Sequence, residues 1–103
     1  MRINNMLQIE NFRQKLVESL EAQKDDLKKK YGTITELAEL CRDTQQDVDH
    51  PDIRDKVLTI IPEEKIADFR GMNGEQLTAM AESFRGQFRG VDDAIMTINN
   101  TNP

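Results

Sequence analysis

The sequence has few of the residues that catalysis and covalent cross-linking need. It contains no tryptophan, one tyrosine, one histidine and one cysteine. The single cysteine, Cys41, cannot form an internal disulfide, and this is typical of a reducing compartment. The single histidine, His50, has no second histidine and no activated nucleophile to work with. We therefore predict a protein that is not an enzyme and that needs no cofactor.

Long apolar runs are also missing. The first residues, MRINNMLQIENF, hold one arginine and no apolar stretch long enough for a signal peptide, and no later stretch reaches the length of a membrane span. We expect a soluble protein without membrane contact, located in the cytoplasm or in a particle assembled there.

Aromatic residues are scarce, and all four phenylalanines are followed directly by arginine. The four pairs are Phe12–Arg13, Phe69–Arg70, Phe84–Arg85 and Phe88–Arg89. The last two pairs form FRGQFRG across residues 84 to 90. Either the arginines cover the margins of buried apolar stripes with their aliphatic stems, or rings and cations together form one contact surface.

The length of 103 residues predicts a single domain, 1–103, whose ends, 1–8 and 100–103, we expect to be flexible. Charged residues make up 32% of the chain and hydrophobic residues 37%. This is little apolar material for an isolated core, so we expect an oligomer or a protein partner to contribute buried surface.

Helical periodicity dominates the first half of the chain. The first apolar stripe consists of Ile9, Phe12, Leu16, Leu20, Leu27 and Tyr31. Lys28, Lys29 and Lys30 precede Gly32, as is typical of a helix C-terminus. Thr33 and Glu36 resemble a capping box, which predicts a second helix that reaches about Gln46 and carries Cys41 on its apolar face.

The middle of the chain is acidic. Residues 31–68 hold ten acidic and four basic side chains, and the net charge of the whole chain is −5. The aspartates at 47, 49, 52 and 55 lack the spacing of a calcium loop, and Pro51 favours a helix start there, so we predict no metal site. Short helices follow over residues 51–61 and 62–71, divided by Pro62 and ended by Gly71.

The last helix has the clearest pattern. Asn73 and Gln76 form a cap-like pair, after which apolar residues recur in alternating steps of four and three. They are Leu77, Ala81, Phe84, Phe88, Val91, Ile95 and Ile98. This heptad seam predicts one long helix through Gly86 and Gly90; the alternative is a helix that ends at Gly90.

These patterns predict an all-α fold, a small bundle of four or five helices with long N-terminal and C-terminal helices. The function we expect is that of a protein–protein interaction module, an assembly, adaptor or accessory subunit that self-associates or docks through the C-terminal helix. The residues expected at this interface are Leu77, Ala81, Phe84, Arg85, Phe88, Arg89, Val91 and Ile95.

Two alternatives remain open. In the first, Asp47, Asp49, Asp52 and Asp55 form an acidic surface that mimics nucleic-acid charge, so that the protein inhibits a target by blocking its basic site. In the second, the phenylalanine–arginine pairs bind nucleic acid, with rings stacking on bases. The acidic net charge opposes direct binding to a phosphate backbone, so we expect a protein partner or a homo-oligomer.

Overall fold

The protein is an all-α bundle, as its sequence predicts. A computed structural model describes residues 2–100, and the side chains of residues 8–100. No strand occurs in residues 2–100. The α-helices are α1 (Arg2–Thr44), α2 (Arg54–Val57), α3 (Glu63–Ile66) and α4 (Gly74–Asn100), and the 3-10 helices are η1 (Pro51–Ile53) and η2 (Ala67–Phe69).

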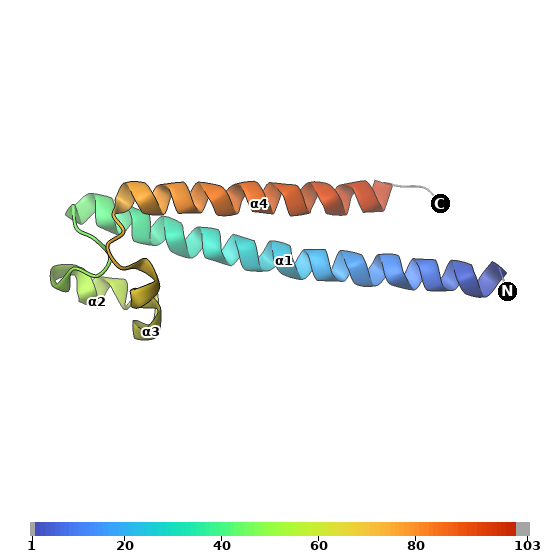
Figure 1. Ribbon diagram of the computed structural model, residues 1–103, viewed down its shortest axis with the longest axis horizontal. Coiled ribbons are helices and arrows are strands. Elements are labelled where there is room, and N and C mark those ends of the chain that lie inside the picture. The colour runs from blue at the N-terminus through green and yellow to red at the C-terminus, as the bar shows by residue number, and fades with distance from the viewer. Residues whose placement is uncertain (1, 101–103) are drawn as a thin grey trace.

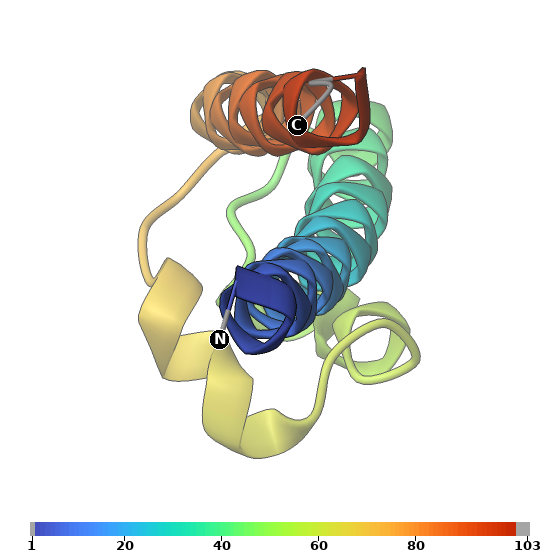
Figure 2. The same cartoon turned by 90° about the vertical axis from the view of Figure 1, so that its right-hand side faces the viewer.

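Two long helices form an antiparallel hairpin that sets the shape of the molecule (Figure 1). The molecule measures 66 × 22 × 17 Å. At a rise of about 1.5 Å per residue, the 43 residues of α1 account for the longest dimension by themselves. The short helices form a lobe near the C-terminal end of α1, and Figure 2 shows α1 lying between this lobe and α4.

The prediction of a helix end at Gly32 and of a new helix from Thr33 is wrong, because α1 continues through both residues to Thr44. The residues facing the rest of the molecule, Leu27, Ile34 and Leu37, are all buried on this one helix. A break at Gly32 would remove part of this packing, whereas an exposed glycine inside a helix costs only about 1 kcal/mol relative to alanine.

The C-terminal end of α1 is closed by Gln45, which adopts a left-handed conformation with φ of 58°. The N–H of Gln46 donates a hydrogen bond of 3.2 Å to the carbonyl of Cys41. This is the Schellman arrangement, which satisfies a carbonyl that would otherwise lack a partner at the helix end. The predicted end near Gln46 is therefore confirmed to within two residues.

The lobe follows the predicted pattern of short helices. Pro51 opens η1, and the His50 side chain caps it by accepting the N–H of Asp52 at Nδ1, 3.1 Å away. Pro62 precedes α3, and Gly71 ends the lobe with a φ of 74°. Only glycine adopts such a positive φ at no steric cost.

The C-terminal helix is continuous from Gly74 to Asn100, which confirms the prediction of one helix through Gly86 and Gly90. Its start is the predicted cap. The Asn73 side chain accepts the N–H of Gln76, and the Gln76 side chain accepts the N–H of Asn73, both at 2.9 Å. This reciprocal pair satisfies two donors at the helix start.

The core lies at the lobe end of the hairpin, where α1, α4 and the short helices meet. It comprises Ile34, Leu37, Ala38, Cys41, Val48, Ile53, Val57, Ile61, Ile66, Leu77 and Ala81. The N–H of Val48 also donates to the carbonyl of Met72, which joins the two ends of the lobe at 3.1 Å. Burial decreases along the hairpin away from this end, because only two helices remain there.

The predicted flexible ends fall partly within the helices. Residues 2–8 begin α1 and Asn100 ends α4, while residues 1 and 101–103 lie outside the described residues. A helical backbone does not by itself report motion, so the flexibility of these ends stays a prediction.

Candidate functional site on the helical hairpin

An ion pair between the two long helices marks their register. Lys24 Nζ of α1 lies 2.8 Å from Asp92 Oδ1 of α4, and it also lies 5.5 Å from the centre of the Phe88 ring. The hydrogen bond to Asp92 raises the pKa of Lys24. Lysine favours its charged form beside a carboxylate and over an aromatic face, so both contacts hold these positions of α1 and α4 level.

The heptad seam of α4 packs against α1 within the same chain. Leu77, Ala81 and Ile95 are buried, while Phe84, Phe88 and Val91 are half-buried. Leu27 and Leu20 of α1 line the same interface beside Val91. The seam therefore already has an apolar partner, and the exposed residues of the predicted interface are Arg85 and Arg89.

The hairpin is uneven in length. Lys24 is level with Asp92, and Asn100 follows Asp92 by eight residues, so the antiparallel register places Asn100 level with about residue 16 of α1. Figure 1 shows the N-terminal part of α1 extending past the end of α4. We call this part, residues 2–16, the tip.

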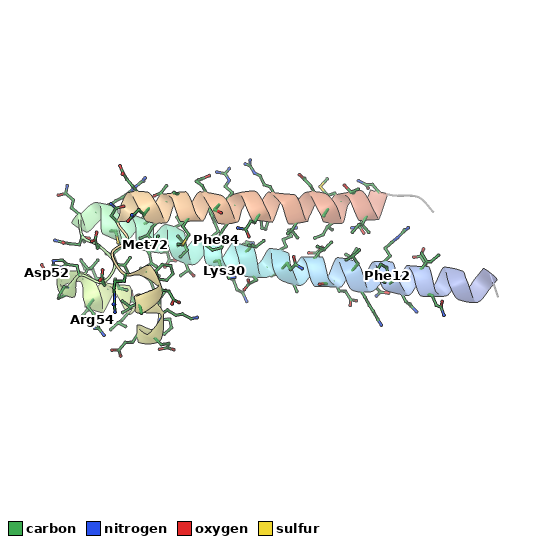
Figure 3. The ribbon with its side chains drawn as sticks, viewed as in Figure 1. Phe12, Lys30, Asp52, Arg54, Met72 and Phe84 are labelled. Atoms are coloured by element: carbon green, nitrogen blue, oxygen red, sulfur yellow. The ribbon has the colours of Figure 1, made fainter. Side chains whose placement is uncertain are left out.

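The tip carries large apolar side chains that are exposed to solvent. The exposed fraction is 57% for Ile9, 69% for Phe12 and 39% for Leu16. These residues continue the helical face that carries Leu20 and Leu27 where α1 meets α4. Phe12 is labelled on this part of α1 in Figure 3. The apolar stripe of α1 therefore extends past the end of α4, which covers the rest of the stripe.

The phenylalanine–arginine pairs differ in how far their rings are buried. Phe69 and Phe84 pack against the core, whereas Phe12 is exposed on the tip. Arg85 and Arg89 lie beside Phe88 in a groove of about 460 Å³ that Lys28 and Tyr31 complete from α1.

Acidic side chains limit the length of this cationic groove. Glu82 lies 3.9 Å from Arg85, measured from Oε1 to Nη1, and the Lys24–Asp92 pair follows along the other direction of α4. A nucleic-acid backbone that followed the hairpin would therefore meet carboxylates within a few turns. Nucleic-acid binding through the arginines stays a prediction.

The four aspartates of the predicted acidic surface are all exposed on the lobe and the segment that leads to it. Asp49 accepts the N–H of Gly71 at 3.1 Å, so one of them has a structural role. Figure 3 places Asp52 in the lobe, at one end of the molecule. Within residues 8–100, no ion pair joins these aspartates to Arg85 or Arg89. Charge mimicry by Asp47, Asp49, Asp52 and Asp55 stays a prediction.

The one thiol of the chain lies in the core. Cys41 is buried, and burial together with the nearby Asp47 raises the pKa of its thiol. A smaller fraction of this thiol is therefore ionised to the nucleophilic thiolate at a given pH. Among the described side chains, no group of three acidic, histidine or cysteine residues could hold a metal ion. Across the described helices, none combines the length and apolarity that crossing a bilayer requires.

Two features of this site were missed by reasoning from sequence. The sequence does not distinguish the tip from the rest of the first apolar stripe, and it predicts a helix end after Lys28, Lys29 and Lys30 that does not exist. The sequence did hold a signal for the first feature. Helical periodicity covers more residues before the lobe than after it, so the longer stripe must leave some apolar residues unpaired in a hairpin.

Comparison with known proteins gives no further assignment: no protein family matches this chain, and neither a curated protein nor a solved structure matches it.

Proposed function

We propose that this protein is a non-enzymatic protein-interaction module that self-associates through the tip. The observation that carries the proposal is the stripe of Ile9, Phe12 and Leu16, which continues the α1–α4 interface past the end of α4 and stays exposed. A contiguous exposed apolar stripe on a protein of this size marks an interaction site.

Continuity with the interface inside the chain supports a second copy as the partner. α4 runs antiparallel to α1 (Figure 1), and Val91 of α4 lies beside Leu20 and Leu27 of α1. The tip of a second copy, placed antiparallel to the first tip, would begin where α4 ends and would continue along the same face. Each tip then covers the other, so the contact is closed and symmetric, as in most homodimers.

The register of such a dimer follows from the length of the tip. Residues 2–16 have Ile9 as their midpoint, so the two-fold axis passes close to Ile9, and Phe12 of each copy lies one turn away from it. The heptad seam of α4 supports this assembly by holding α1 in place, while Arg85 and Arg89 of α4 are exposed and lie outside the tip.

A cross-linking experiment tests the position of the axis. Ile9→Cys should form a disulfide-linked dimer rapidly under mild oxidation, because two copies of residue 9 meet at the axis. Asn11→Cys is the matched control, since Asn11 is exposed but lies about 200° around the helix from Ile9. Cys41 stays in both variants because it is buried.

The outcome separates the alternatives. Rapid cross-linking at residue 9 and slow cross-linking at residue 11 support the antiparallel dimer. Equal rates for the two variants, or a wild-type protein that sedimentation equilibrium shows to be a monomer at all concentrations up to 1 mM, would overturn it.

A further inference from the structure

A second unassigned feature is a cleft of about 330 Å³ where α1, the lobe and α4 meet. Its apolar floor is formed by Ile34, Ile61, Phe69, Met80 and Phe84. Three segments that are distant in the sequence contribute to it, so the tertiary structure creates the cleft. We call it the lysine-rimmed cleft, because Lys29, Lys30 and Lys65 surround the floor, with Asp68 as the one acidic residue at the rim.

Two of the three lysines at the rim, Lys29 and Lys65, are not explained by contacts that fold the chain. Lys30 has partners within the chain, because it lies 2.9 Å from Asp26 and 5.9 Å from the centre of the Phe84 ring. Figure 3 labels Lys30 on α1 and Phe84 on α4. Lys29 and Lys65 are exposed, and no carboxylate of residues 8–100 forms an ion pair with either. A helix dipole does not account for Lys29, since α1 continues well beyond it to Thr44.

An apolar floor with a cationic rim is complementary to an apolar group that carries negative charges beside it. We propose that the lysine-rimmed cleft binds a short acidic segment of a partner protein. One or two apolar side chains of this segment fill the cleft, and its carboxylates contact Lys29 and Lys65. The volume of the cleft lies at the lower end of the range for ligand sites, which suits side chains.

Charge and surface chemistry select this occupant over others. The floor consists of apolar side chains, so it offers little hydrogen bonding to the edges of a nucleic-acid base. The tip of a second copy has the wrong charge, since residues 8–16 carry Arg13 and Lys15 against Glu10. The proposal does not rest on self-association, because residues of the lobe line the cleft, whereas the tip lies at the other end of α1 (Figure 1).

Fluorescence anisotropy tests the proposal with the full chain and a rhodamine-labelled peptide in which leucine and phenylalanine are flanked on each side by glutamates. Two control peptides carry serine in place of the apolar residues, or lysine in place of the glutamates. We expect the first peptide to bind and both control peptides to bind at least tenfold more weakly.

Matched protein variants locate the binding. Lys29→Glu with Lys65→Glu should weaken binding about tenfold or more. Lys28→Glu with Lys56→Glu is the control, since it alters exposed lysines outside the cleft and gives the same change in net charge, from −5 to −9. Circular dichroism measures whether both variants keep their helical content. A loss of binding is attributed to the cleft only in a variant that is folded.

Each result is decisive. Loss of binding in the cleft variant with retention in the control variant supports the cleft. Equal loss in both variants, no binding of the acidic peptide at 1 mM, or tighter binding of labelled single-stranded DNA that the cleft substitutions abolish would overturn the proposal. Intact peptide binding in Ile9→Cys or Phe12→Ala would show that the cleft works independently of the tip.

Discussion

Replacing Phe12 by alanine separates the contribution of the tip to folding from its contribution to assembly. Phe12 is 69% exposed in the single chain, so about a third of its surface is already covered there. Burying a whole phenylalanine side chain stabilises a protein by roughly 1.5–3 kcal/mol. The substitution should therefore reduce the free energy of unfolding of the isolated chain by no more than about 1 kcal/mol.

The effect on the dimer should be larger. If the tip of a second copy covers the remaining surface, each Phe12 contributes about 1–2 kcal/mol to association, and the two copies together contribute about 2–4 kcal/mol. Because about 1.4 kcal/mol corresponds to a factor of ten, the Kd of the dimer should rise by roughly 30- to 700-fold. Association would then change far more than folding.

Sedimentation equilibrium over a concentration series measures the Kd of the dimer. Urea unfolding at a concentration where the chain is monomeric measures the free energy of unfolding. Leu58→Ala is the matched control, because Leu58 is also exposed, at 40%, but lies in the lobe. An unchanged Kd in Phe12→Ala, or an equal rise of the Kd in Leu58→Ala, would refute the reasoning.

Three further predictions concern folding and are read by urea unfolding. Gly32→Ala and Gly86→Ala should each stabilise the protein by about 1 kcal/mol, since both glycines are helical with open space around an added Cβ; destabilisation by Gly32→Ala would contradict a continuous α1. Gly74→Ala should destabilise it by about 1–3 kcal/mol, because the new Cβ would lie 2.5 Å from Cγ of Arg42. Burial and the charge of Asp47 raise the pKa of the Cys41 thiol in the folded chain. The stabilising contribution of the neutral thiol to the free energy of unfolding is therefore fully present below the pKa of the unfolded thiol, about 8.5, and is lost as the pH rises through the higher pKa of the folded chain. Unfolding measured from pH 7 to 10 should show this loss in the wild type, whereas Cys41→Ala should show a smaller decline; parallel declines would exclude the thiol as the cause.

Local signals predicted the elements whose ends are fixed by local chemistry. The Asn73–Gln76 pair sets the start of α4, and its two hydrogen bonds form between residues three apart. Pro51, Pro62 and Gly71 divide the lobe as expected, because their allowed backbone angles do not depend on distant packing. The all-α class and the long terminal helices followed from the same periodicity.

Gly32 shows where local reasoning failed. A glycine after three lysines is a common helix end, but the backbone angles of glycine also allow a helix to continue. The choice depends on the burial of Leu27, Ile34 and Leu37 against elements that come later in the chain. Local backbone preferences near Gly32 favour a helix end by a small free energy. Tertiary packing favours continuation of the helix by a larger one.

The sequence by itself determined that this protein is helical, where its caps lie, and which face of each long helix is apolar, because these properties depend on neighbours within one or two turns. Only the tertiary structure decided how much of each apolar face is covered. The register of the two long helices, in which Lys24 lies beside Asp92, covers the seam of α4 and leaves Ile9 and Phe12 exposed on the longer helix. Packing of the lobe against the hairpin likewise gathered Lys29 and Lys65 around one apolar cleft. Both candidate surfaces arise from the relative length and placement of helices, which depend on contacts between residues far apart in the chain.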